Sequence, residues 1–107
     1  MRQAEIYMNN TLAGILTEEN RNSFVFQYDG TYFADQNKPA VSLTLPKTQK
    51  EFRGKFLFPV FSNLLSEGAN RKLQSRLLKI DEEDDFGILL ATAQYDTVGA
   101  ITVKQIR

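Results

Sequence analysis

Apolar and polar residues alternate with a period of two in the first part of the chain, a pattern typical of strands that bury one face. Residues 4–9 and 12–17 form two such runs, which are separated by Asn9 and Asn10. Asparagine tolerates the left-handed backbone conformation that a tight hairpin turn requires. The pattern therefore predicts a β-hairpin at the N-terminus.

A third strand is predicted where Phe24, Phe26 and Tyr28 fall on a single aromatic face. Asp29 and Gly30 then provide a turn, because both residue types are favoured in tight turns. These positions extend the predicted hairpin into a sheet of at least three strands.

The stretch AVSLTLP, residues 40–46, alternates again and predicts another strand. Val41, Leu43 and Leu45 would share one face of it, and proline would end it. The next nine residues, 47–55, are polar and are interpreted as an exposed loop, or alternatively as a contact patch for an acidic partner. The basic residues of this segment are Lys47, Lys50, Arg53 and Lys55.

The spacing of apolar residues then changes to about 3.6, which predicts a block of helices. Pro59 suits the first turn of a helix, and Phe61, Leu64 and Leu65 fall on one side of it. Gly68 suits the position just past the end of that helix. A first short helix is therefore expected between the proline and the glycine.

Two more helices are predicted. One covers about residues 70–79, with an apolar stripe at Leu73, Leu77 and Ile80 and with basic residues on its wet side. The other begins near residue 84 or 85. Its apolar positions are Phe86, Leu89, Leu90 and Ala93.

The chain closes with GAITVKQI, residues 99–106, an alternating stretch that places Ile101 and Val103 on one face of a last strand. Strands, a block of about three helices and a strand that returns to the sheet define an α+β fold with a small antiparallel or mixed sheet. The length of 107 residues and the absence of a linker or repeat predict a single domain, residues 1–107.

Composition narrows the class of protein. Hydrophobic residues make up 42% and charged residues 24%, as in ordinary soluble domains. Thirteen basic residues balance thirteen acidic ones, so the net charge gives no reason to expect binding to nucleic acid or to a membrane. The N-terminus lacks an apolar signal core and no apolar run approaches a membrane-spanning length, so a cytoplasmic location is expected.

Catalytic chemistry has little support in the residue types present. The chain has no histidine and no cysteine, which removes the commonest general base, metal ligand and thiol nucleophile. Its six glycines are too widely spaced for a phosphate-binding loop. We therefore expect no enzymatic activity, no metal and no cofactor.

The acidic run at residues 81–85 is the most conspicuous charge feature. Catalytic carboxylates or a cation site would require further ligands or a spaced D-x-D-x-D-G loop, which the run lacks. Carboxylates at the start of a helix cap free N–H groups and meet the positive end of the helix dipole. Capping of the third helix is the favoured interpretation.

Four stretches in order carry a family resemblance. They are MNNTLAGIL, PAVSLTLP, FPVFSNLLSEGANRKL and DDFGILLATAQYDTVGAITV. Together they resemble the N-terminal subdomain of HipA-type serine/threonine kinase toxins, which shows an alanine– or valine–glycine pair in its hairpin, an SLSLP strand, an FFxNLLPEGxxR segment and a DxFxLLxxxGxDxxGAV segment. The resemblance spans nearly the whole chain.

The resemblance implies a function in a toxin–antitoxin system. In full-length relatives, the subdomain precedes the ATP-binding and catalytic parts of the kinase, and this chain stops where they would begin. It is therefore expected to be the split form, HipS, a non-catalytic antitoxin that binds a HipT-like kinase together with a HipB-like helix-turn-helix protein. The alternative is an excised subdomain of a single-chain kinase. Met1 and the complete last strand favour the natural short protein.

The same resemblance implies a contact loop for the kinase, which could either block catalysis or only assemble the complex. The loop residues are Leu64, Leu65, Ser66, Glu67 and Gly68, and the basic residues of 47–55 are secondary candidates. Phe61 and Leu64 are expected to anchor this loop, while Leu65, Ser66 and Glu67 protrude. Two residues depart from the family pattern: Ser66 replaces a frequent proline and Tyr95 a frequent glycine. The chain also has no tryptophan to act as a plug.

Overall fold

The computed structural model describes residues 1–65, 68–81, 83–92 and 101–106. The predicted hairpin is confirmed: β1 (Arg2–Met8) pairs antiparallel with β2 (Thr11–Asn20). Asn9 and Asn10 join them with φ angles of 50° and 67°. Both angles are left-handed, as a tight two-residue hairpin turn requires.

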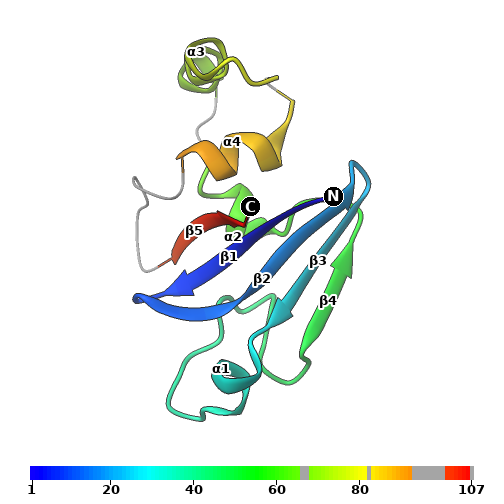
Figure 1. Ribbon diagram of the computed structural model, residues 1–107, viewed down its shortest axis with the longest axis vertical. Coiled ribbons are helices and arrows are strands. Elements are labelled where there is room, and N and C mark those ends of the chain that lie inside the picture. The colour runs from blue at the N-terminus through cyan, green and yellow to red at the C-terminus, as the bar shows by residue number, and fades with distance from the viewer. Residues whose placement is uncertain (66–67, 82, 93–100, 107) are drawn as a thin grey trace.

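Five strands form one antiparallel sheet in the order β4-β3-β2-β1-β5 (Figure 1). β3 (Ser23–Tyr28) continues the N-terminal meander and is the predicted aromatic strand. β5 (Ile101–Ile106) returns to pair with β1, and β4 (Glu51–Gly54) lies at the other edge. The predicted α+β class and the returning last strand are confirmed.

Residues 40–46 do not form the predicted strand. Their only ladder contact is an isolated bridge between Ser42 and Leu45, and Leu43 is 99% exposed. Val41 and Leu45 belong to the core, and the hydroxyl of Tyr28 holds their backbone by accepting the Val41 N–H at 2.9 Å and donating to the Leu45 carbonyl. A turn held by a buried tyrosine thus takes the place of the predicted strand and leaves Leu43 in solvent.

The polar segment 47–55 is not wholly a loop, because it contains β4. The prediction failed here because an edge strand needs little apolar surface, and only Phe52 on this strand packs against the core. Asp29 and Gly30 also do more than turn the chain. Asp29 caps α1 (Gly30–Ala34) and accepts the N–H of Tyr32 at 3.2 Å.

The helical block comprises α2 (Pro59–Ser62), α3 (Gly68–Leu78) and α4 (Asp85–Thr92). Its number of helices agrees with the prediction. Gly68 does not end the first of them, however, but begins the second. Ala93 lies outside the described residues. No helix among residues 1–65, 68–81, 83–92 and 101–106 is long and apolar enough to span a membrane.

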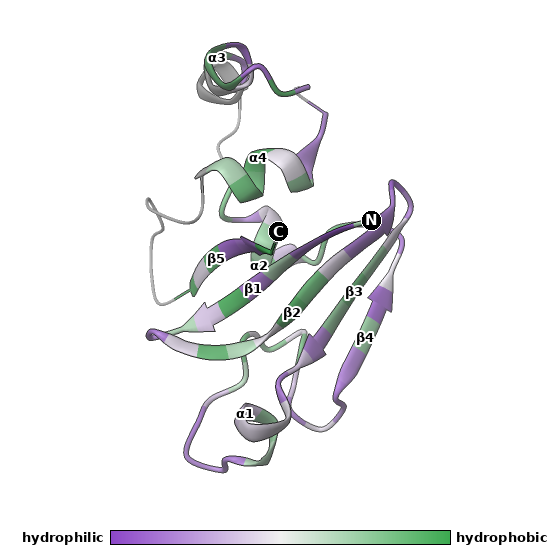
Figure 2. Ribbon diagram, in the orientation of Figure 1, coloured by the Kyte–Doolittle hydropathy of each residue, from purple (hydrophilic) through white to green (hydrophobic). Residues whose placement is uncertain are grey.

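The core lies between one face of the sheet and the helices α2 and α4, where apolar segments meet (Figure 2). Phe26 of β3 packs against Phe61 of α2, with ring centroids 5.8 Å apart. The sheet contributes buried side chains from four strands, and α4 contributes Phe86, Ile88, Leu89 and Leu90. Burial of this one face explains the period-two pattern of the first strands.

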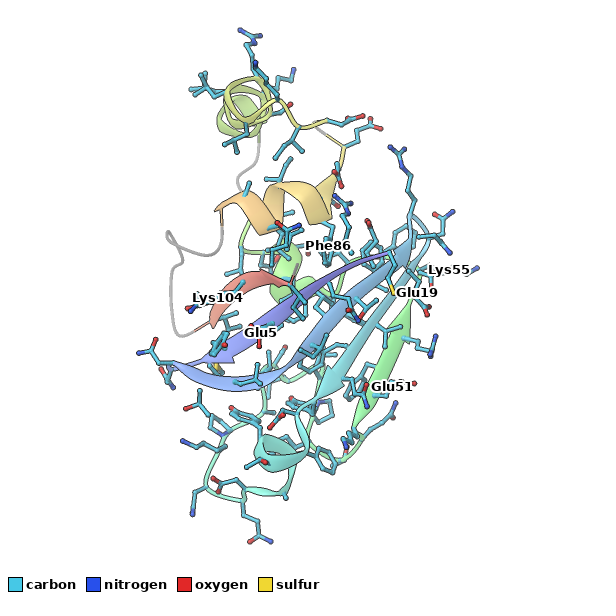
Figure 3. All side chains as sticks on the ribbon, viewed as in Figure 1. Glu5, Glu19, Glu51, Lys55, Phe86 and Lys104 are labelled. Atoms are coloured by element: carbon cyan, nitrogen blue, oxygen red, sulfur yellow. The ribbon has the colours of Figure 1, made fainter. Side chains whose placement is uncertain are left out.

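The other face of the sheet is polar. Glu5 of β1 lies opposite Lys104 of β5, and the ammonium group of Lys104 lies 5.0 Å from the ring centroid of Tyr7. Figure 3 shows Glu5 and Lys104 side by side on neighbouring strands. Desolvation, followed by the nearby charge of Glu5, raises the pKa of Tyr7 above its ordinary value.

Candidate partner-binding surface

The predicted contact loop begins at α2, whose position is set by aromatic packing. Phe58 occupies the N-cap and Pro59 the first turn, where a missing N–H costs nothing. Phe61 is fully buried, and its ring centroid lies 6.3 Å from that of Phe58. The expected role of Phe61 as an anchor of this segment is confirmed.

Leu65 does not protrude as expected, because it is only 8% exposed and belongs to the core. The α-helix ends at Ser62, and the chain continues in tighter turns. In these turns the N–H of Leu64 bonds to the carbonyl of Phe61 and that of Leu65 to the carbonyl of Ser62, both at 3.1 Å. The expectation that Leu65 protrudes was wrong, because Leu65 follows Phe61 by four positions and lies with it on the buried side of this segment.

Leu64 packs against the core while staying partly exposed. Ser66 and Glu67 lie outside the described residues, and Gly68 is described only as the first residue of α3. Of the five predicted loop residues, Leu64 is thus the one whose described side chain is both anchored and accessible.

The four basic residues of segment 47–55 do not act as one patch. Lys47 is held inward: its ammonium donates to the carbonyls of Asp35 and Lys38 at 2.5 and 2.9 Å, and it lies 5.1 Å from the ring centroid of Tyr32. A structural role for Lys47 follows, because its hydrogen bonds tie together two loops beside α1.

Arg53 is balanced by neighbouring carboxylates. Its guanidinium lies 3.2 Å from both Glu19 and Glu51. Lys50 and Lys55 flank the strand at its two ends; both are exposed and, within the described part of the chain, neither pairs with a carboxylate. These two lysines are the members of the predicted set that remain available to a partner.

A cavity of about 600 Å³ lies beside α2 and was not foreseen from the sequence. It is formed where the β2–β3 turn, the β4–α2 connection and the start of α4 meet. Its lining residues are Glu18, Arg21, Asn22, Phe24, Lys55, Phe56, Leu57, Ser62, Glu83, Asp84, Asp85 and Phe86. Charges of both signs line it, and Figure 3 places Lys55 near Glu19 at this end of the sheet.

The N-terminus of α4 is fixed to the sheet by Arg2. Its guanidinium makes two hydrogen bonds to the Asp84 carboxylate, at 2.7 and 3.0 Å, and a third to Glu18 at 2.8 Å. Asp84 also accepts the N–H of Gly87 at 3.1 Å, so the predicted capping role of the acidic run is confirmed for this residue. Hydrogen bonding to Arg2 lowers the pKa of Asp84 below its ordinary value.

Gly87 makes room for this network. A Cβ at this position would collide with the Asp84 carboxylate and would lie 3.1 Å from the Arg2 guanidinium. The role of Arg2 was missed because it is a single charge 82 positions from its partner in sequence. The alternation within the first strand predicts on which face of the sheet Arg2 lies, but not which residue it pairs with.

The described residues contain no group of three or more histidine, cysteine, aspartate or glutamate side chains that could hold a metal ion. Two of the carboxylates that line the cavity, Glu18 and Asp84, form ion pairs with Arg2.

Residues 4–104 match the HipA N-terminal domain family, and the chain therefore belongs to that family. A solved structure described as the N-terminal domain of HipA toxin is similar over 100% of this chain and 94% of that chain, with a TM-score of 0.74 and 28% sequence identity. The resemblance seen in the four sequence stretches is confirmed.

A curated relative is "Putative kinase Y4mE" of Sinorhizobium fredii (strain NBRC 101917 / NGR234). It is 25% identical over 89 residues, which are 83% of this chain and 21% of that protein. The chain thus spans about a fifth of the length of this relative. Membership in the HipA N-terminal domain family thus relates this chain to one domain of HipA-type toxins.

Proposed function

We propose that this chain is a non-catalytic regulatory subunit that binds a HipT-like serine/threonine kinase in the place of its missing N-terminal subdomain. The observation that carries the proposal is the family match over residues 4–104, together with likeness over the whole chain to the N-terminal domain of HipA toxin. A HipB-like DNA-binding protein would complete a ternary complex. The chain would act there as the antitoxin.

The contact with the kinase is proposed for residues 64–68. Within it, Leu64 is anchored against the core yet partly exposed, which suits a side chain that enters a partner surface. Leu65 would hold the loop against the core, because its side chain is buried there. Lys50 and Lys55 are retained as secondary contacts, since both are exposed.

A second candidate is the N-terminal structural subdomain of a single-chain kinase. The match to a protein named as a kinase, of which this chain covers 21%, favours it specifically. The two candidates predict opposite effects on a kinase that lacks this subdomain. An antitoxin lowers its activity, whereas a structural subdomain supplied in trans raises it.

The test is to induce the cognate shortened kinase in a bacterial host with and without this chain, and to measure growth and kinase autophosphorylation. The proposal expects growth arrest by the kinase alone, recovery when the chain is present, and reduced autophosphorylation. Increased autophosphorylation and stronger arrest would instead establish the second candidate. Persistent arrest with a soluble chain at a level equal to that of the kinase would exclude the antitoxin role.

A further inference from the structure

Helix α3 exposes apolar residues that the sequence pattern assigns to a buried stripe. Leu73 is 53% exposed, Leu77 72% and Leu78 42%. None of the described side chains of α3, residues 72, 73 and 75–78, belongs to the core or packs against it. Figure 1 shows α3 at the end of the molecule farthest from α1, with α4 between it and the sheet.

This helix is nevertheless fixed at its C-terminal end. Lys79 adopts a left-handed φ of 57°, and the N–H of Ile80 bonds to the carbonyl of Ser75 at 3.0 Å. This 6→1 bond is the mark of a Schellman cap. The Ser75 hydroxyl also donates to the Ile80 carbonyl at 2.6 Å, and the Ile80 side chain packs against the core. The leucines are therefore presented by an anchored helix.

Four of the exposed residues form two parallel rows, and Leu78 follows them at the end of the helix. Leu73 and Leu77 are four positions apart and share one face of the helix, and Lys72 and Arg76 form the adjacent row one residue earlier. Both basic side chains are exposed. No residue between Gly68 and Leu78 is acidic. We call Lys72, Leu73, Arg76, Leu77 and Leu78 the α3 ridge.

We propose that the α3 ridge docks into an apolar groove of the kinase partner whose rim carries carboxylates. The inference rests on the proposed function and adds a second contact to it. Burial of the leucines would remove apolar surface from water, and acidic residues beside the groove would complement Lys72 and Arg76.

Other occupants fit the ridge less well. A second copy placed ridge to ridge would bring Lys72 and Arg76 of both chains together without an acidic residue on either helix, and like charges repel. A membrane surface usually takes helices with aromatic anchors and a strongly charged face. The α3 sequence has no aromatic residue, and the whole chain has thirteen charges of each sign.

Two double variants separate the apolar and charged parts of the ridge. Leu73→Gln with Leu77→Gln removes the apolar row with a residue that favours helices, and should weaken binding to the shortened kinase about tenfold or more. Lys72→Gln with Arg76→Gln should slow association several-fold at low salt and much less at high salt, about 0.5 M. Titration calorimetry and surface plasmon resonance measure these effects.

The matched control is Leu43→Gln, which alters a fully exposed leucine on the turn after α1. It should bind like the wild type, and all variants should keep their melting temperatures. Unchanged affinity of the leucine variant, with wild-type binding intact, overturns the α3 proposal alone. Absence of wild-type binding overturns the proposed function as well.

Two further measurements identify the other occupants. Wild-type chain that sediments with vesicles of phosphatidylcholine and phosphatidylglycerol, when the leucine variant does not, would assign the ridge to lipid and overturn the proposal. Dimerisation of the wild type in analytical ultracentrifugation, lost in the leucine variant, would assign it to a second copy. The proposal expects a monomeric chain that does not bind the vesicles.

Discussion

Tyr28 satisfies backbone groups that have no strand partner. Its hydroxyl bonds to both Val41 and Leu45, and its ring stacks on that of Tyr32 at a centroid distance of 6.1 Å. Burial raises the pKa of this hydroxyl above its ordinary value of 10.0. The hydroxyl of one buried residue therefore holds the backbone at both ends of the segment 41–45.

The pair Arg2 and Asp84 makes the stability of the fold depend on pH. The folded-state pKa of Asp84 lies below its ordinary value of 3.8 because Arg2 stabilises the carboxylate. The ionised pair therefore stabilises the fold above that ordinary value, and the contribution is lost as the pH falls through the lower folded-state pKa.

Asp84→Asn should lower the free energy of unfolding at pH 7 by about 1–2 kcal/mol, because the pair is only partly screened by water. The difference from the wild type should shrink as the pH falls below about 4. Urea unfolding at several pH values measures it. Glu83→Gln, an exposed neighbour, is the control and should change little. A constant difference between pH 7 and pH 2.5 would mean that the ion pair is not responsible.

At the scale of elements, the turn after α2 determines what the contact loop can present. Leu65→Ala should lower the free energy of unfolding by about 2–4 kcal/mol, because it leaves a cavity in the core. Leu43→Ala should change it by less than about 0.5 kcal/mol, because Leu43 is exposed. Thermal and urea unfolding of the two variants measures this contrast. Equal stability would place Leu65 outside the core and restore it as a protruding contact.

Elements that bury a regular face could be predicted from the sequence. The hairpin, β3, β5 and α4 each repeat apolar residues at the period of their structure. The edge strand β4 could not be predicted, because it pairs on one side through its backbone and is largely polar. The turn at residues 41–45 has the alternating sequence of a strand, but its backbone is held by the hydroxyl of Tyr28, a bond that the alternation does not reveal.

The candidate site could be predicted only in part. The burial of both Phe61 and Leu65 follows from their spacing of four residues, and the expectation that Leu65 protrudes set that spacing aside. Leu73 and Leu77 have helical spacing, but spacing alone does not tell whether a partner within the chain covers them. The hydrogen bonds of Lys47 and the ion pairs of Arg53 involve residues that only the fold brings close to them.

For the whole molecule, we propose that the two candidate contacts form one extended interface. The turn containing Leu64 and Leu65 is followed in the chain by α3, whose ridge is exposed. A subdomain that replaces a fused part of a kinase should bury an interface of roughly 1,200–2,000 Å² or more. Such an area is expected to keep the two chains together at micromolar concentration.

Binding of the shortened kinase is the most direct test of this account. The kinase and this chain are co-expressed, captured through a tag on the kinase alone, and passed over a size-exclusion column at micromolar concentration. We expect both chains in one peak, at a mass equal to their sum or a multiple of it. Elution of the two chains in separate peaks, with both folded by circular dichroism, would contradict the proposed function.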